Sequence, residues 1–347
     1  FMNGIGTLLY LFVCKGKIPA YLGSSFAFIA PVAGVLSAGL GYEAAKGAFV
    51  VFGLSFVILS ILVRYIGTRW IDKLFPPAAM GAIVAIIGLE LAPVAMSMSG
   101  LIGNQDLGMS HSQAIILSAF MGVVDFSGVE AAPWFSLPQF YGMPVFDINA
   151  IIMIMPALFV VFAEHVGHLV VTSNIVSKDL MKEPGLQRSL LGDGLANILS
   201  GFFGATPNTT YGENIGVLAI TRCFSVWVIG GAAVLAMIIS FVGKVAALIH
   251  AIPVPVMGGV SILLFGIIAA SGLRMLVERK VDYTNPVNMI LTSVILVVGL
   301  SGAELAVGPV VLKGMGLATV VGMAMSICLL ILQKTGVGND QLKKTEV

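Results

Sequence analysis

Long apolar stretches alternate with short polar ones along the whole chain, and most of the apolar stretches have the length of a membrane-spanning helix. A helix needs about 20 apolar residues to cross the hydrocarbon layer of a bilayer. Two shorter stretches, Ala27–Leu40 and Asn214–Thr221, are expected to be helices that each follow a broken segment, and Ala114–Val124 is too short to span. The expected spans are Phe1–Cys14, Gly47–Val63, Pro77–Met96, Ile151–Val171, Leu190–Ala205, Ser225–Ile249, Val254–Ser271, Val287–Leu300 and Pro309–Leu332.

Two interruptions stand at matching places in the two halves of the chain. The segment TPNTTYG, Thr206–Gly212, carries a proline and residues that favour extended structure. We expect it to be non-helical and to lead into a half-helix that begins near Glu213. The uncharged segment AYLGSSFAF, Ala20–Phe28, corresponds to it in the first half, and its free backbone groups are expected either to face a cavity or to pair with Thr209–Gly212. Taken alone, this segment would be read as ordinary packing of small residues between helices.

A short motif also occurs twice. Pro-x-x-x-Met-Gly is found at Pro76–Gly81 and at Pro253–Gly258, each time at the start of an apolar run. The alternative is a chance match in a chain rich in glycine and methionine. Together with the two interruptions, the motif predicts an internal duplication. Interrupted elements at matching places are typical of the midplane binding site of a secondary transporter.

The composition supports a membrane protein. Hydrophobic residues make up 58% of the 347 residues and charged residues 10%, whereas a soluble domain has about 25% charged residues. The net charge is +1 and the chain has no basic stripe, so nucleic acid is not an expected partner. The basic residues cluster between the apolar runs, and such clusters are typical of cytoplasmic loops. Cys14, Cys223 and Cys328 lie in or beside apolar runs and are expected to be small lipid-embedded or core residues rather than disulfides or metal ligands.

Three ionisable side chains lie inside one apolar helix, FVVFAEHVGHLVV. Glu164 and His168 are four residues apart and therefore share a helix face, while His165 points about 100° away. A carboxylate beside an imidazole can hold and pass a proton. Two alternatives stay open. One is a metal site at His165-x-x-His168, although zinc sites need three or four ligands. The other is a purely structural buried cluster.

Glu213 is the other intramembrane carboxylate of interest. A carboxylate deep in a bilayer is costly and persists where it faces a cavity, holds a partner or is protonated. A surface loop between two spans is the alternative. Glu90, Lys244 and Glu304 are expected to lie near span ends with structural roles.

These side chains favour a neutral ligand over an anion. Ionised carboxylates only accept hydrogen bonds, and no lysine or arginine is expected at the depth of Glu164 and Glu213. A nucleobase offers N–H groups to carboxylates and carbonyl groups to backbone N–H groups, and its flat ring could stack on Phe26. Protons or Na⁺ are the natural coupling ions.

The segment ENIGVLAITR resembles the signature of the nucleobase–ascorbate transporter family, in which Gln or Glu precedes Asn-x-Gly, four residues and Thr-Arg. The matching residues here are Glu213, Asn214, Gly216, Thr221 and Arg222. The segments AEHVGHLVVTSNI, GFFGATPNTTYGENIGV and CKGKIPAYLGSSFAF are similar to the same family, so the resemblance covers nearly the whole chain. Glu rather than Gln at the head of the signature favours uracil over purines as the substrate.

The resemblance implies an all-α membrane protein of fourteen spans in two inverted repeats of seven, with two short antiparallel strands at the bilayer midplane. It implies that Glu164 and Glu213 bind the N–H groups of the base, that the backbones of Phe26 and Gly212 hold its polar edge and that His168 assists Glu164 in proton coupling. Phe26 and Tyr211 would flank the ring.

The resemblance also implies a proton-coupled uracil importer of the bacterial inner membrane, with no cofactor and no enzymatic activity, that works by alternating access and forms a homodimer through its gate domain. The expected core domain comprises residues 1–73 and 147–249 and the gate domain residues 74–146 and 250–335. Residues 336–347 form a polar tail.

The chain departs from the family pattern at three places. The first span, with its Gln-His pair, is not found. The stretch Ser112–Phe126 reads as the start of one gate span joined to the end of the next, with roughly a span and a half missing between them. Phe265 stands where a tyrosine is expected. The remaining functional alternatives are a purine or xanthine carrier, a non-transporting uracil receptor of the same fold, and a membrane-embedded metallohydrolase that uses the two histidines.

Overall fold

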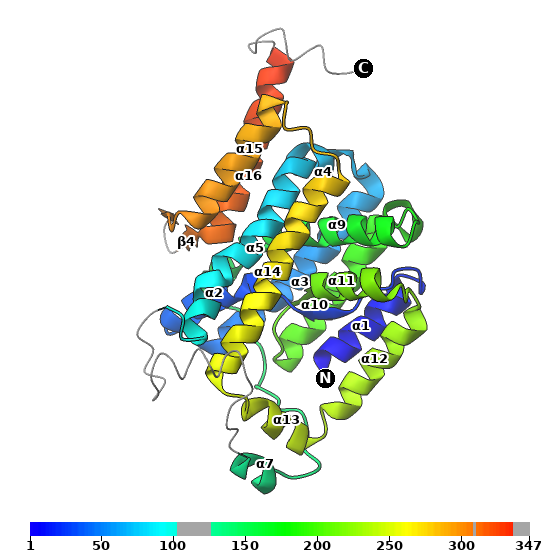
Figure 1. The fold of residues 1–347 in the computed structure, drawn as a ribbon, viewed down its shortest axis with the longest axis vertical. Helices are drawn as coiled ribbons and strands as arrows, with labels where there is room; N and C mark the ends of the chain where they lie inside the picture. The colour runs from blue at the N-terminus through cyan, green and yellow to red at the C-terminus, as the bar shows by residue number, and fades with distance from the viewer. Residues whose placement is uncertain (103–125, 308–309, 336–347) are drawn as a thin grey trace.

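A computed structural model describes residues 1–102, 126–307 and 310–335 (Figure 1). Helices dominate this part of the chain, with two short pairs of strands. Among the described residues, five helices are long and apolar enough to cross a membrane. They are Gly41–Ile66, Pro77–Met98, Ile148–Ile175 (two helices joined by a short turn and counted as one span), Val254–Glu278 and Gly314–Leu332. The predicted all-helical membrane fold is confirmed.

The helices pack in two groups (Figure 1). In the first group, α10 packs against α3 and α1, α12 against α1, and α8 against α3. In the second group, α5 packs against α14 and α15, and α15 against α16. The first group comprises α1 (Met2–Val13), α2 (Ile29–Ser37), α3 (Gly41–Ile66), α8 (Ile148–Ile154), α9 (Ala157–Ile175), α10 (Leu186–Phe203), α11 (Gly212–Thr221) and α12 (Val226–Ile239). The second comprises α5 (Pro77–Met98), α14 (Val254–Glu278), α15 (Pro286–Leu300) and α16 (Gly314–Thr335). Their identification as core and gate domains stays a prediction.

The contact between α5 and α14 carries the signature of an inverted repeat. Both helices begin directly after the prolines of the repeated motif, where a missing N–H is harmless. A Cβ on Gly81 would overlap the side chain of Leu276, and a Cβ on Gly258 would overlap the backbone of Ser99. Gly81 and Gly258 occupy equivalent positions in the two repeats, and Ser99 and Leu276 are separated by the same number of residues as these two glycines. The contact of Gly81 with Leu276 is therefore equivalent to the contact of Gly258 with Ser99. Two helices related by a pseudo-two-fold axis make each of their contacts twice in this way.

The two interrupted segments pair at the middle of the molecule, as predicted. Strand β1 (Leu22–Ser24) runs antiparallel to β2 (Asn208–Thr210), with Gly23 opposite Thr209. Two further backbone bonds extend the pairing, from the N–H of Ser25 to the carbonyl of Pro207 and from the N–H of Tyr211 to that of Tyr21. A short 3₁₀ turn, η1 (Phe26–Phe28), leads from β1 into α2, and β2 leads directly into α11.

Two of the expected spans differ from the structure. Ser225–Ile249 is not one helix but α12 followed by α13 (Gly243–His250), because Val242 pairs with Phe135 and the Lys244 ammonium donates to the carbonyl oxygens of Val129 and Glu130. These contacts join α13 to α7 (Ser127–Ala131) and to the segment after it. Hydropathy along the chain does not report such tertiary contacts, so it could not predict the break.

The stretch Pro309–Leu332 was expected to be helical from its start. Instead, a hairpin of β3 (Glu304–Val307) and β4 (Val310–Lys313) precedes α16. Consecutive β-branched valines favour a strand at this place. The predicted junction at Ser112–Phe126 lies almost entirely outside the described residues, as do Ala114–Val124 and the tail 336–347.

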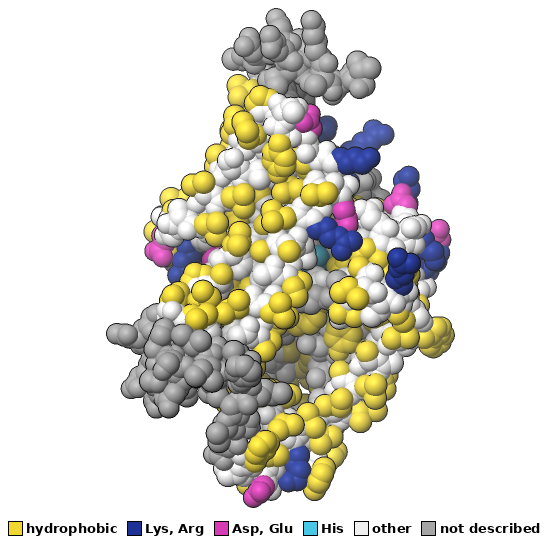
Figure 2. Space-filling view, in the orientation of Figure 1, with side chains coloured by type: hydrophobic (Ala, Val, Ile, Leu, Met, Phe, Trp, Pro, Cys, Tyr) yellow, Lys and Arg dark blue, Asp and Glu magenta, His cyan; other side chains and the backbone are white. Residues whose placement is uncertain are grey.

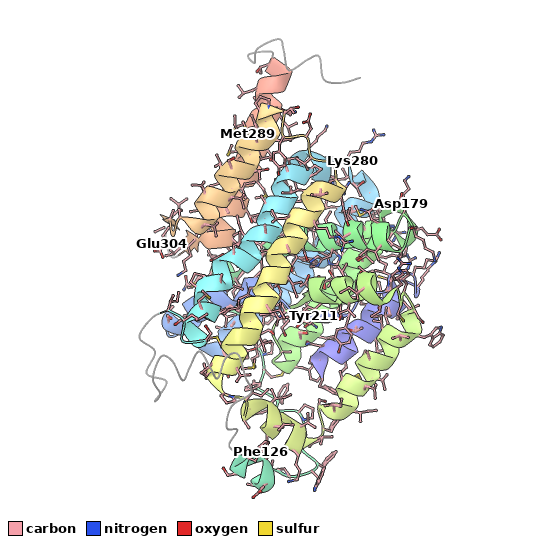
Figure 3. The ribbon with its side chains drawn as sticks, in the orientation of Figure 1. Phe126, Asp179, Tyr211, Lys280, Met289 and Glu304 are labelled. Atoms are coloured by element: carbon pink, nitrogen blue, oxygen red, sulfur yellow. The ribbon has the colours of Figure 1, made fainter. Side chains whose placement is uncertain are left out.

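Most of the basic side chains seen in Figure 2 lie at the upper right of the view, which is one end of the helix bundle. Three contacts hold the loops of this end together: Lys17 pairs with Glu183 in η2 (Met181–Gly185), Arg188 donates to the carbonyl of Val13, and Asn174 donates to Glu278. α4 (Arg69–Leu74) contacts α16 at the same end. Figure 3 shows Asp179 and Lys280 here, Tyr211 centrally, and Glu304 at the opposite edge. Because basic loops tend to face the cytoplasm, we expect this end to lie on the cytoplasmic side.

Candidate substrate site at the paired strands

A small buried cavity lies where both strands meet the helices that follow them. Its walls come from β1 and η1, from β2 and α11, from α9, and from α5 and α14 of the second helix group. It is lined by Ser24, Ser25, Phe26, Val84, Glu164, His168, Thr209, Tyr211, Gly212, Ile268 and Ser271. The cavity thus collects side chains from both halves of the chain and from both helix groups.

The side chains of Glu164 and His168 enter this cavity from one face of α9. Glu164 is 8% exposed and His168 is 5% exposed, so both are nearly dry. The Ser25 hydroxyl lies 3.5 Å from a carboxylate oxygen of Glu164, and Nδ1 of His168 is 3.1 Å from the hydroxyl of Thr210. The two broken segments therefore each contribute a hydroxyl to one member of the pair.

Gly212 allows the close approach between α11 and α9. A Cβ at this position would lie 2.9 Å from Nε2 of His168, which is closer than real side chains approach. Gly212 is also the first residue of α11, so its N–H belongs to the first turn, whose N–H groups have no acceptor within the helix itself. Tyr211 precedes it, and its ring covers Gly23 of β1. Gly212 and Tyr211 both line the cavity, and their predicted contacts with substrate stay predictions.

Glu213 is the second residue of α11. The half-helix predicted to begin near it is therefore present. Its side chain lies outside the described part of the structure, so its predicted contact with substrate stays a prediction.

One aromatic ring of the cavity wall, that of Phe26, contacts the second helix group. Phe26 of η1 meets Phe265 of α14 edge to face, with ring centroids 5.2 Å apart. The space left among the lining side chains is about 10 Å³, which is room for a water molecule but not for a base. Phe26 belongs to η1, which leads into α2 of the first helix group, and Phe265 belongs to α14 of the second, so this ring contact joins the two groups.

A fully buried polar network lies behind the cavity and was not predicted. His165, on the other face of α9, is 2.8 Å from the hydroxyl of Ser189, which in turn is 2.6 Å from that of Tyr10. Nδ1 of His165 is 3.5 Å from a carboxylate oxygen of Asp193, and both residues are fully buried. The signal in the sequence was a lone aspartate between two glycines in an apolar span, LLGDGLANILS.

The metal alternative finds no support in the arrangement of ligands. His165 and His168 face different helices, α10 and α11 respectively. Among the described residues, no group of three or more histidine, cysteine, aspartate or glutamate side chains is placed to hold a metal ion.

Comparisons with known proteins agree on one family. The chain is 54% identical to the uracil permease of Paenibacillus larvae subsp. larvae, over 98% of this chain and 89% of the relative. It is 55% identical to the uracil permease of Escherichia coli (strain K12), over 94% of this chain and 83% of the relative. It is 44% identical to that of Bacillus subtilis (strain 168), over 94% and 85%.

A solved structure has the same fold. The transmembrane domain of a cyanobacterium bicarbonate transporter, BicA, superposes with a TM-score of 0.51 at 15% sequence identity, covering 93% of this chain and 89% of that chain. At this identity the likeness concerns the fold alone.

The alignments also bear on the predicted junction in the gate. The alignment with the Paenibacillus larvae relative extends over 375 positions, more than the 347 residues of this chain, so part of the relative faces gaps here. The model described as Permease family matches residues 1–113 and, as a second piece, 112–308. The two pieces meet within the stretch Ser112–Phe126, where the sequence indicates that one span runs into another. The chain is a multi-pass bacterial membrane protein, and it belongs to the permease family of the xanthine and uracil permeases, the nucleobase–ascorbate transporters whose signature it carries.

Proposed function

We propose that the protein takes up uracil together with a proton by alternating access, with the cavity between the paired strands as the substrate site. The observation that carries the proposal is the convergence of Glu164 and His168 with both broken segments in one nearly dry site. The names of the relatives, which are uracil permeases at 44–55% identity, favour uracil over purines.

The described lining of the site matches the chemistry of uracil. It contains no lysine or arginine, so an anion would find no counter-charge there. The carboxylate of Glu164 accepts a ring N–H, and Glu213 is assigned the same role at a second N–H. The N–H groups of Phe26 and Gly212, at the starts of η1 and α11, donate to the ring carbonyls. The rings of Phe26 and Tyr211 hold the base from its faces.

Proton coupling is assigned to Glu164 and His168. A carboxylate and an imidazole on one helix face exchange a proton readily. Beside a neutral His168, an ionised Glu164 would be an uncompensated charge in a dry site, which is costly. Taking up a proton on the Glu164–His168 pair removes this cost, so substrate and proton are expected to load together.

Alternating access is proposed because the cavity is closed in this structure and is bounded by both helix groups. Val84, Ile268 and Ser271 belong to the second helix group, and the other lining residues belong to the first group or to the paired segments that lead into its helices. A base enters only when the two groups separate, starting with the Phe26–Phe265 contact. Homodimer formation through the second group is part of the same proposal.

Uptake into proteoliposomes tests substrate and coupling together. We expect labelled uracil to accumulate under an inwardly directed proton gradient and to stop accumulating when the gradient is dissipated. An excess of unlabelled xanthine should not compete. Uracil uptake that ignores the gradient would exclude proton coupling, and strong competition by xanthine would move the substrate to the purine branch.

A matched pair of variants locates the site. Glu164→Gln is expected to abolish uptake, whereas Glu183→Gln, the same chemical change in a surface ion pair with Lys17, is expected to leave it unchanged. Normal uptake by Glu164→Gln would show that the site lies elsewhere.

A further inference from the structure

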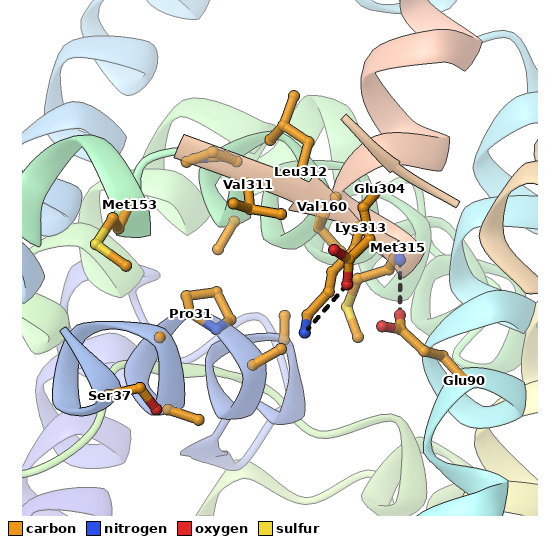
Figure 4. Close-up of a pocket in the computed structure, with 17 residues that line it drawn as sticks. Pro31, Ser37, Glu90, Met153, Val160, Glu304, Val311, Leu312, Lys313 and Met315 are labelled. Atoms are coloured by element: carbon orange, nitrogen blue, oxygen red, sulfur yellow. Dashed lines mark hydrogen bonds and ion pairs between the residues drawn. The ribbon is translucent and has the colours of Figure 1, made fainter. Parts of the chain in front are cut away.

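A second and much larger cavity lies next to the substrate site and has no role in the mechanism above (Figure 4). Its volume is about 430 Å³, within the range of small-molecule pockets. Its walls come from η1, α2, α8 and α9 of the first helix group and from α5, α16 and the β3–β4 hairpin of the second. Like the substrate site, it is bounded by both groups.

The two cavities are neighbours along two elements. On η1, Phe26 lines the substrate site and Ala27 lines the larger cavity. On α9, Glu164 lines the substrate site and Val160, one helical turn earlier, lines the larger cavity. The larger cavity includes Glu304 of the hairpin, at the edge of the molecule opposite Lys280. It therefore lies on the outer side of the substrate site.

The two walls of the larger cavity differ in chemistry. The wall formed by η1, α2 and the start of α9 presents small or apolar side chains, among them Ala30, Pro31 and Ala157. The opposite wall carries charged groups from the second helix group: Glu90, Glu304 and Lys313 (Figure 4). A cavity with one apolar wall and one charged wall suits a flat ligand that has an apolar face and polar edges.

Glu90 is held in place by the start of α16. One carboxylate oxygen accepts a hydrogen bond of 2.6 Å from the N–H of Met315, in the first turn of that helix. Gly314 has φ of +50°, and a Cβ there would overlap the Glu90 carboxylate. The other oxygen is open toward the cavity (Figure 4). Lys313 is only loosely paired with Glu304, at 3.9 Å.

We propose that this cavity is an outer capture site for the substrate, a neutral pyrimidine base, before it reaches the midplane. The base lies on the small side chains of α2, donates a ring N–H to the free oxygen of Glu90 and accepts a hydrogen bond from Lys313 through a ring carbonyl. Separation of η1 from α14 then opens the way past Phe26. The choice of ligand rests on the function proposed above.

Thiol protection tests capture without requiring transport. Ala33 lines the cavity and is exposed, so Ala33→Cys offers a thiol inside it. Cys223 and Cys328 are first replaced by serine, and Cys14 is buried and can stay. A membrane-impermeant methanethiosulfonate reagent is added outside the cells, and the labelling rate is measured against uracil concentration.

The decisive background is Glu164→Gln, in which the midplane site is disabled. We expect uracil still to slow the labelling of Ala33→Cys in this background. Adding Glu90→Gln, which keeps an oxygen for the Met315 N–H but removes the charge, should raise the half-protecting concentration about ten-fold. Adding Glu130→Gln, a carboxylate in α7 outside the cavity, should leave it unchanged.

Loss of protection in the Glu164→Gln background would overturn the capture site, because the protection would then come from the midplane site. Protection that is insensitive to Glu90→Gln would overturn it as well. Uracil uptake by the otherwise unaltered protein is measured in the same cells. Its absence would overturn the proposed function instead, so the two failures are distinguishable.

Discussion

At the scale of single residues, the substrate site depends on contacts that leave no room for extra atoms. Gly212→Ala would place a Cβ 2.9 Å from Nε2 of His168, and relieving such overpacking costs about 1–3 kcal/mol. We expect uracil affinity to fall roughly ten-fold or more while the protein still folds. Uptake kinetics measure the effect. Gly231→Ala is the control, because its Cβ would meet nothing within 4 Å, and an equal loss there would contradict this explanation.

The buried network behind the site gives a prediction about stability. Ser189→Ala removes the hydroxyl that lies between Tyr10 and His165 and leaves two buried polar groups without it. Each stranded group costs about 1–3 kcal/mol, so thermal unfolding in detergent should occur at a clearly lower temperature. Ser55→Ala should change little, because among the described residues the Ser55 hydroxyl donates only to the carbonyl of Val51 in its own helix. Equal melting temperatures for both variants would refute the role of the network.

Residue chemistry explains which part of the site was predictable. Glu164 and His168 stand out because charged groups are rare inside an apolar helix, and their spacing fixes a common face. Asp193 has the same signature, but its partner His165 lies 28 residues away on another helix, and no spacing rule links residues across helices. The hydroxyls of Ser25 and Thr210 are common residue types whose role appears only when the strands pair.

At the scale of elements, the packing of α5 on α14 depends on glycines in both helices. Gly272→Ala would place a Cβ against the backbone N of Ala85 and the carbonyl of Gly81. The helices must then move apart, at a cost of about 1–3 kcal/mol. Gly266→Ala, in the same helix, has open space around its Cβ. We expect only the first variant to lower the unfolding temperature, and a similar fall for both would contradict close helix contact.

Interrupted elements were predictable because their causes are local. Proline, glycine and threonine in Thr206–Gly212 disfavour a helix, and the matching Ala20–Phe28 supplied the partner. The break between α12 and α13 has a distant cause, the pairing of Val242 with Phe135. The β3–β4 hairpin lies inside an apolar run, where strand and helix cannot be told apart by hydropathy alone.

At the scale of the whole molecule, the distribution of charge predicts orientation in the membrane. Lys280 belongs to the basic end and Ser37 to the rim of the outer cavity. An impermeant thiol reagent should label Lys280→Cys only in inside-out vesicles and Ser37→Cys only in right-side-out vesicles. The reverse pattern would invert the molecule and place the larger cavity on the cytoplasmic side.

The two-fold relation between the halves connects these scales. Sequence repeats suggested it through a weak motif, and the structure supports it through equivalent contacts of Gly81 and Gly258 and through the antiparallel pairing of β1 with β2. Such an arrangement places a pair of interrupted elements at the midplane. From this layout we expect the two helix groups to move relative to each other. No single sequence motif predicts that movement.

The most direct test of the central claim is equilibrium binding of labelled uracil to the purified protein. The unaltered protein and Glu183→Gln should bind uracil equally well. Glu164→Gln should bind at least about 100-fold more weakly, because a charged acceptor in a dry site is replaced by a neutral amide. Unchanged affinity in Glu164→Gln would show that the base does not bind between the paired strands.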